Sequence, residues 1–197
     1  YEDTEFSDSF FDVVVGNVPF HNIKVSDRRY DRYNFKIHDY FLAKSLDKVR
    51  SGGILAVITT KFTMDKENQS VRKYIAQRAD LLGAIRLPNN TFKGNAGTEV
   101  VSDILILQKR DRLIDLEPEW VHLNTDENGV KMNAYFVDHP EMVLGEWKTV
   151  SGRFGEEDTV VSYENADLAE LLDEAISNIH AEITDYEVDE ELTEEDN

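Results

Sequence analysis

Short apolar runs alternate with helical patterns along the first 110 residues. Four runs predict buried strands, at residues 10–15, 54–60, 84–87 and 100–108. Spacings of three and four predict a first helix on one face, through Phe35, His38, Leu42, Leu46 and Val49. Asn34 is the expected cap of this helix, and Gly52-Gly53 its expected end. A second helix is predicted through Val71, Tyr74, Ile75 and Ala79. This alternation predicts an α/β fold with a largely parallel sheet.

The pattern changes after Arg110. Short strand-like pieces are expected at residues 120–123, 135–137 and 159–163, and an amphipathic helix runs from Leu168 to Ile179. The end of the chain, residues 184–197, carries eight Asp or Glu and no Lys or Arg, which predicts disorder. We therefore expect a sheet-forming part at 1–110, a small acidic α/β extension at 111–183 and a disordered tail at 184–197.

The net charge of −19 hides a strong asymmetry. Residues 21–110 carry 17 Lys or Arg and 9 Asp or Glu, a net charge of +8, whereas residues 111–197 carry 4 and 26, a net charge of −22. A basic middle joined to an acidic end keeps nucleic acid among the possible ligands of the middle part, although the average charge argues against it.

The segment Phe11-Asp12-Val13-Val14-Val15-Gly16-Asn17-Val18-Pro19-Phe20 places a polar amide where a buried strand ends. Ligands of open α/β sheets bind at the carboxyl ends of the strands, so Asn17 is a candidate site residue. The alternative is that the segment has a purely structural role, as an ordinary Asn-x-Pro turn after a core strand. The segments around it decide between the two.

This motif resembles the Asn-Pro-Pro-Phe/Tyr motif of amino-group DNA methyltransferases, above all the adenine methylases related to type I modification subunits. Three further segments resemble the same family in the same order: Ser51 to Thr59, Gly83 to Phe92 with its I-x-L-P-x-x-x-F pattern, and Gly97 to Leu107. The resemblance covers residues 10–110. The same residues also resemble the methylase segment of helicase–methylase fusions found on mobile elements. It implies the second half of a Rossmann-like class I methyltransferase sheet.

The resemblance also implies a mechanism on a base rotated out of the duplex. The Asn17 side-chain oxygen and the Val18 carbonyl would accept the two hydrogens of the adenine N6 amine, which aims its lone pair at the methyl group. Phe20 would stack on the base. Val18 departs from the family, which has proline there. Since only its carbonyl is used and Pro19 keeps it extended, we expect Val18→Pro to be nearly neutral for methyl transfer.

The methyl donor of the family is S-adenosylmethionine, and its glycine-rich loop precedes the Asn motif. Only sixteen residues precede Asn17, so we expect this loop to lie outside the chain, the cofactor-binding residues to be unknown and the isolated chain to be inactive. Gly94 to Gly97 and Gly152 to Gly155 are interpreted as loop glycines. Expected partners are DNA, the missing N-terminal half of the methyltransferase domain, and a helicase or specificity module.

A polar stretch from His21 to Tyr33 is long for a connection, and long loops are often functional. Its cations would contact phosphates and its aromatics would stack, so the candidate DNA-binding residues are Lys24, Arg28, Arg29, Tyr30, Arg32, Tyr33 and Lys36. The alternative is a solvated loop whose arginines pair with Asp27, Asp31 and Asp39. His38 is interpreted as structural, and Lys61 as a weak candidate for the same cleft.

Two alternatives stay open: a non-catalytic methyltransferase-like module that binds DNA or a protein, and a methyltransferase acting on protein or RNA. Other classes are excluded more firmly. The chain has no cysteine, which excludes disulfides and thiolate metal sites and is compatible with the cytoplasm. It shows no metal-ligand spacing, and it has no apolar run long enough to span a membrane.

Overall fold

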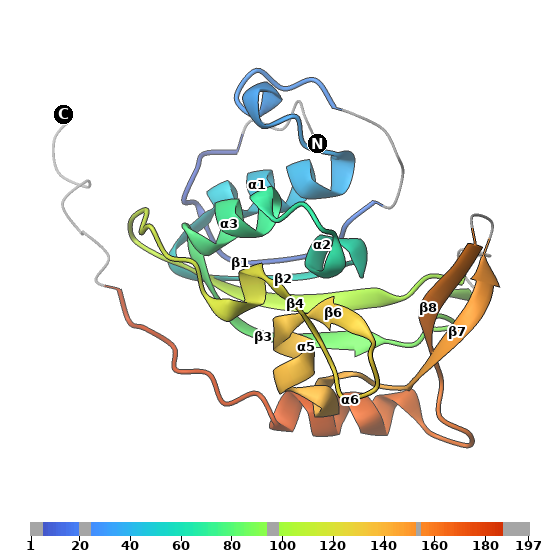
Figure 1. Cartoon of the computed structure of the whole chain (residues 1–197). Coiled ribbons are helices and arrows are strands. Elements are labelled where there is room, and N and C mark those ends of the chain that lie inside the picture. The colour runs from blue at the N-terminus through green and yellow to red at the C-terminus, as the bar shows by residue number, and fades with distance from the viewer. Residues whose placement is uncertain (1–5, 20–24, 94–98, 153–154, 187–197) are drawn as a thin grey trace, which may run out of the picture.

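The computed structural model describes residues 6–19, 25–93, 99–152 and 155–186. Its centre is a four-stranded sheet with the spatial order β1-β2-β4-β3 (Figure 1). The strands are β1 (Phe11–Asn17), β2 (Val49–Thr60), β3 (Ala79–Leu87) and β4 (Ser102–Lys109). β1 and β2 pair in parallel, and β4 is antiparallel to both β2 and β3. The predicted α/β class is confirmed, but the expectation of a largely parallel sheet is wrong: the sheet is mixed, because β4 lies between β2 and β3 and runs opposite to both.

Three helices connect the first three strands: α1 (Ile37–Lys48), α2 (Phe62–Asp65) and α3 (Ser70–Ala76). Since β1 and β2 are parallel, α1 runs back along the sheet between them. Its last residues therefore lie beside the beginning of β1, where Ser9 N and Phe10 N donate to the carbonyls of Asp47 and Lys48. The beginning of α1 accordingly lies toward the opposite, carboxyl edge, where β1 ends at Asn17.

Two predicted details of the first helix are wrong. Asn34 does not cap α1, because it adopts a left-handed backbone with φ +51° and ends a short 3-10 helix at Asp31–Tyr33. Gly52-Gly53 does not end the helix either: α1 stops at Lys48, and both glycines lie inside β2. A Cβ on Gly53 would come within 2.7 Å of the Asp12 carbonyl oxygen, so the close approach of β1, not a helix end, requires glycine here.

The two edge strands of the sheet, β3 and β1, differ in what packs against them. Along β3, Leu144 N donates to the Arg86 carbonyl and Asn89 N donates to Val160, so a later segment lies against this edge. β1 ends the sheet on the other side, with Val13 56% and Val15 76% exposed. Their cross-strand partners on β2, Ile54 and Ala56, are only half-buried. An apolar strip is therefore left open at β1.

The described residues after 110 share one hydrophobic core with the sheet. They form two antiparallel hairpins: β5 (Leu123–Thr125) with β6 (Lys131–Asn133), and β7 (Glu146–Gly152) with β8 (Gly155–Val161). The two α-helices are α5 (Ala134–Asp138) and α6 (Leu168–Ser177). Two short 3-10 helices lie at Glu119–Val121 and Pro140–Met142. In Figure 1, α5 and α6 lie below β3 while the β7–β8 hairpin stands at the right. The helix predicted from Leu168 is confirmed.

Other predictions for this part are wrong. The expected strand at 135–137 is the helix α5, which Asn133 caps by accepting a hydrogen bond from Tyr135 N. The expected strand at 120–123 is mostly a 3-10 helix. The start of the predicted disordered tail is held on the sheet, because Thr184 exchanges two hydrogen bonds with the Gln108 side chain. Residues 187–197 lie outside the described residues.

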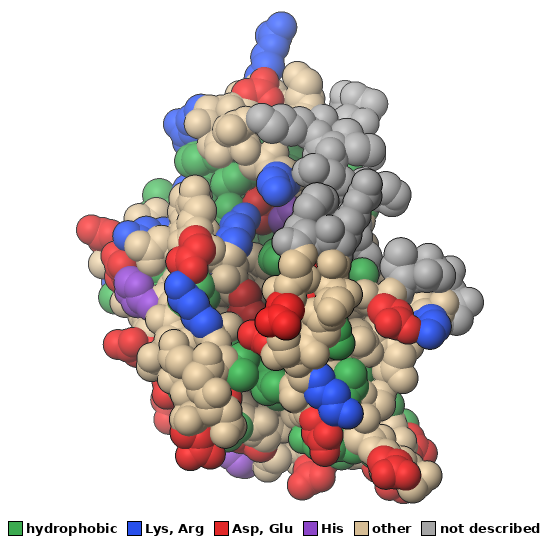
Figure 2. All heavy atoms as spheres, turned by 45° about the vertical axis from the view of Figure 1, so that its right-hand side comes forward, with side chains coloured by type: hydrophobic (Ala, Val, Ile, Leu, Met, Phe, Trp, Pro, Cys, Tyr) green, Lys and Arg blue, Asp and Glu red, His purple; other side chains and the backbone are tan. Residues whose placement is uncertain are grey.

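The charge asymmetry of the sequence is also an asymmetry in space. On the face in Figure 2, acidic side chains predominate in the lower half of the molecule, where residues 111–186 lie in Figure 1. The helices of the described part are all too short or too polar to cross a membrane.

Candidate functional site at the carboxyl edge of the sheet

The candidate site lies where β1 and β2 end. Asn17 is the last residue of β1, is exposed, and lies opposite Ile58 in the parallel register. The chain then continues through Val18 and Pro19, while Phe20 lies outside the described residues. Asn17 thus presents an exposed amide at the edge where open α/β sheets bind ligands.

Val18 fixes the backbone next to this amide. Its side chain is 4% exposed and belongs to the core, and its N–H donates to the Ile58 carbonyl over 2.9 Å. Proline has no N–H and could not make this bond. The departure from the family has a structural reason, since valine here adds one strand-like hydrogen bond and fills the core. Proline at position 18 would lose this bond, whereas its expected neutrality for methyl transfer stays a prediction.

Lys61 follows β2 at the same edge. Its Nζ donates to the Asp158 carbonyl on β8 over 2.5 Å and lies 5.8 Å from the centre of the exposed Phe62 ring. Burial lowers the pKa of the Lys61 ammonium, and the nearby Arg86 guanidinium lowers it further. The hypothesis that Lys61 faces this edge agrees with its position, but its ammonium is occupied by β8.

Arg86 forms a buried ionic cluster next to Lys61. It donates to both oxygens of Asp103 and both oxygens of Asp65, at 2.6–2.9 Å, and its guanidinium lies 4.3 Å from the Phe136 ring centre. Arg86 and Asp103 are both fully buried. Burial would lower the pKa of Arg86, but the two carboxylates raise it, so the side chain stays charged. The cluster ties α2, β3 and β4 together behind the site.

The predicted DNA-binding loop spans from one edge of the sheet to the other. It leaves the carboxyl edge after Pro19 and reaches the amino edge at Arg29, whose guanidinium pairs with Asp8 at 2.5 Å and with Asp47 at 3.2 Å. It returns to the carboxyl edge at Lys36, the exposed residue before α1. The loop therefore does not gather all its cations near Asn17.

The predicted DNA-binding residues occupy different environments. Tyr30 is 4% exposed, and its hydroxyl donates to Asp47 over 2.5 Å. Tyr33 is half-buried and stacks on Phe35 with 5.1 Å between ring centres. Arg28, Arg29 and Arg32 are exposed, and Lys24 lies outside the described residues. Of the alternative acidic partners, Asp31 bonds within the loop and Asp39 pairs with Lys66. Asp27 accepts from Arg29 N within the loop and also bonds Tyr40 and Lys44 of α1.

His38 lies near the beginning of α1. Its Nε2 is 3.4 Å from Asp39 Oδ1, and Lys66 approaches the other oxygen of Asp39 to 2.7 Å. Burial lowers the pKa of His38, against the opposing effect of Asp39. A half-buried histidine held by its neighbour in the chain fits the structural role expected for it.

The glycine segments do not provide a recognisable cofactor loop. Gly152 ends β7 and Gly155 begins β8, so they connect two antiparallel strands, whereas a dinucleotide-type loop leads from a strand into a helix. Residues 94–98, which hold the other glycine pair, lie outside the described residues. In the described ranges, no three His, Asp or Glu side chains are grouped as a metal site would require.

Sequence reasoning missed a second set of cations, at the amino edge. Arg78, Lys109, Arg110 and Arg112 lie there beside Arg29 and Arg32. A signal was present in the sequence, since Lys109-Arg110-Asp111-Arg112 places three cations in four residues directly after the last strand. The buried Arg86 and Asp103 also had a signal, because each interrupts an apolar strand.

Residues 2–92 match the family model of the Eco57I restriction-modification methylases. The chain is also similar to the defence against restriction protein B of Escherichia phage P1, with 33% identity over 147 residues. These are 73% of this chain but only 6% of that protein. The predicted resemblance to restriction-modification methylases is therefore confirmed.

Among solved structures, a Listeria monocytogenes protein described as a class I S-adenosylmethionine-dependent methyltransferase matches with 23% identity and a TM-score of 0.44, over 59% of this chain and 36% of that one. A Vibrio vulnificus protein described as a type I modification subunit matches with 17% identity and a TM-score of 0.42, over 83% and 40%. The chain thus spans less than half the length of each of these proteins.

Proposed function

We propose that this chain, whose residues 2–92 match a restriction-modification methylase family, supplies the target-base half of an S-adenosylmethionine-dependent DNA methyltransferase that acts on the N6 amine of adenine. The observation that carries the proposal is the exposed Asn17 amide at the carboxyl end of β1, next to a backbone held by the Val18–Ile58 hydrogen bond.

The arrangement suits an exocyclic amine. The lone pair of such an amine is delocalised into the ring, so it is a poor nucleophile until its two hydrogens are bound out of the ring plane. The Asn17 side-chain oxygen is one acceptor and the Val18 carbonyl the second. Val18 is anchored by its buried side chain and its N–H, so the second acceptor is fixed before the base arrives. The stacking role of Phe20 is part of the proposal.

The methyl donor needs a further part of the protein. The glycines of the β7–β8 hairpin do not fit a cofactor loop, so we assign donor binding to residues outside the described part of this chain. S-adenosylmethionine would supply the methyl group, and this chain's own residues would bind and orient the base.

The open edge at β1 is the surface on which that further part would dock. A terminal strand exposes backbone groups that can pair with another strand, and here it also carries the exposed Val13 and Val15. We assign this edge to the remaining strands of the methyltransferase sheet, supplied by the parent protein. Pairing would bury the valines and bring the donor site beside Asn17. A helicase or specificity module is a further proposed partner.

The test is single-turnover methylation of an adenine-containing duplex by the complete parent protein. Asn17→Ala should lower the rate by a hundredfold or more, since one aligned polar group stabilises such a step by about 3 kcal/mol. Phe20→Ala should weaken capture of the flipped base, whereas Phe20→Tyr should be tolerated. Asn128→Ala, on the exposed β5–β6 turn, is the matched control.

Near-normal turnover in Asn17→Ala would reject the assignment of the motif. If the parent protein binds DNA through this chain but transfers no methyl group with Asn17 intact, the non-catalytic alternative holds instead.

A further inference from the structure

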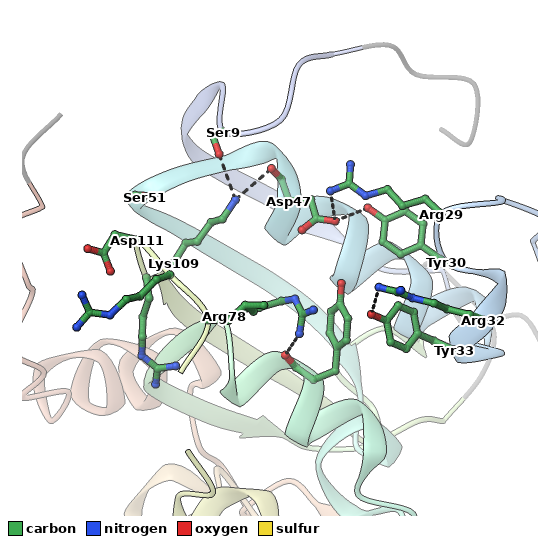
Figure 3. A pocket seen from close by; sticks show the side chains of 14 residues that line it. Ser9, Arg29, Tyr30, Arg32, Tyr33, Asp47, Ser51, Arg78, Lys109 and Asp111 are labelled. Atoms are coloured by element: carbon green, nitrogen blue, oxygen red, sulfur yellow. Dashed lines mark hydrogen bonds and ion pairs between the residues drawn. The ribbon is translucent and has the colours of Figure 1, made fainter. Parts of the chain in front are cut away.

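A hollow lies at the amino edge of the sheet, opposite the edge where Asn17 lies. Ser9 before β1, Asp47 near the end of α1, Ser51 in the first part of β2 and Lys109 at the end of β4 all line it (Figure 3). Its volume is about 320 Å³. Because β1 ends at Asn17 and begins beside this hollow, its seven residues separate the two places by roughly 20 Å, at about 3.3 Å per residue.

The lining of this hollow is cationic, although two of its cations are ion-paired: Arg29 with Asp8 and Asp47, and Arg110 with Asp80. Six side chains carry a positive charge and two a negative one, Asp47 and Asp111. The cations come from the loop before α1, the end of α3 and the segment after β4; they are Arg29, Arg32, Arg78, Lys109, Arg110 and Arg112. A concave surface with an excess of one charge concentrates counter-ions of the other.

Three of these cations interact with uncharged groups. Arg78 donates to the Tyr74 carbonyl over 2.9 Å, and its guanidinium lies 3.5 Å from the Tyr74 ring centre. Arg32 donates to the Tyr33 hydroxyl, with 4.6 Å between guanidinium and ring. Lys109 donates to the carbonyls of Val49 and Asp47, at 2.7 and 3.2 Å. These partners hold the cations in place but do not neutralise them.

Burial lowers the pKa of the Lys109 ammonium, since it lies partly out of water. The nearby carboxylates of Asp47 and Asp8 oppose this effect only in part. An anion bound in the hollow would stabilise the charged form of Lys109. The stacked guanidinium of Arg78 is likewise oriented in advance, and its planar fork suits two oxygens of one phosphate group.

We propose that this pocket at the amino edge binds phosphate groups of a nucleic-acid strand. A strand suits it better than a single anion, because its cations come from three segments and continue into the loop through the exposed Arg28 toward Lys36 at the carboxyl edge. The proposal rests on the proposed function for the identity of the strand. A duplex bound at Asn17 would contact the cations of this pocket roughly six base pairs away, at 3.4 Å per pair.

The test is binding of the full 197-residue chain to a fluorescently labelled 20-base-pair duplex, measured by anisotropy at several salt concentrations. The variant Arg78→Ala/Arg112→Ala removes two pocket cations. The control Lys131→Ala/Lys148→Ala removes two exposed cations of the hairpins, so both variants have the same net charge. Circular dichroism would verify that each one is folded.

We expect the pocket variant to bind at least tenfold more weakly at low salt, and the control less than twofold. The slope of log affinity against log salt should fall by about two in the pocket variant, close to one for each lost phosphate contact. Equal binding by the two variants would overturn the proposal, as would failure of the unmodified chain to bind the duplex.

A competition with pyrophosphate distinguishes the two sources of phosphate. If pyrophosphate binding depends on Arg78 and Arg112 while duplex binding does not, the pocket takes a small phosphate and the assignment to a nucleic-acid strand is wrong. A pocket variant that binds more weakly to the duplex supports the proposal whatever the Asn17→Ala rate proves to be. Failure of one proposal is therefore distinguishable from failure of the other.

Discussion

The two terminal strands of the sheet reverse the usual placement of residue types. β1 carries three consecutive valines, yet Val13 and Val15 are mostly exposed. β3 carries an arginine, yet Arg86 is fully buried, between two carboxylates and under a later segment of the chain. The contrast shows that the environment of a strand depends on what lies beside it. β3 has its neighbours within this chain, whereas the described residues place no element over Val13 and Val15 of β1.

Arg86→Ala should have the largest effect. It leaves Asp103 buried without its counter-charge, which typically costs about 3–5 kcal/mol. Urea denaturation followed by circular dichroism would measure it. Arg50→Ala is the matched control, because Arg50 pairs with the exposed Asp12 at the surface, where water and salt screen the attraction, so its loss should be much smaller. Equal losses in the two variants would show that the cluster at β3 is no more important than a surface pair.

Val18→Pro should have an intermediate effect, on the inner side of β1. It removes the hydrogen bond to the Ile58 carbonyl, and a bond of this kind contributes about 1 kcal/mol to the free energy of unfolding. The same denaturation experiment measures the change. Unaltered stability would mean that the family's proline is accommodated here without cost and that the Val18–Ile58 hydrogen bond contributes little.

Val15→Ser should change the stability of this chain least, by no more than about 0.5 kcal/mol, because Val15 is 76% exposed. Val57→Ser, on the buried face of the neighbouring strand, should cost on the order of 2 kcal/mol. In the complete parent protein the ranking should change, since Val15 would be covered there. A Val15→Ser parent that unfolds no more easily than the unmodified protein would argue against the docking proposed for β1.

The sequence was informative where one pattern decides one structure. The periodicity after Leu168 predicted α6, because burial on one side repeats at a fixed spacing. The apolar run before Asn17 predicted the strand β1, but the expectation that this strand is buried is wrong, since Val13 and Val15 are mostly exposed. It failed where contacts between distant segments decide. Gly52-Gly53 reads as a helix end until the approach of Asp12 is known, and residues 135–137 read as a strand until Asn133 caps them as a helix.

The same limit applies to the candidate sites. Asn17 could be predicted because its role follows from its place at a strand end. The pocket at the amino edge could not, because Arg32, Arg78 and Lys109 are far apart in the sequence and only the fold brings them together. The loop that holds Arg29 was correctly singled out as basic, but its crossing from one edge to the other depends on the ion pairs with Asp8 and Asp47.

The open edge of β1 also has a consequence for the colloidal behaviour of the chain. An apolar strand with free backbone groups is a template for strand addition between copies, the first step of ordered aggregation. Here the net charge of −19 acts in the opposite direction, since copies repel one another before their edges can meet. Salt screens this repulsion within about 10 Å at 0.1 M. The acidic residues of the second half would thus keep copies of the chain apart and limit aggregation through the unpaired edge of β1.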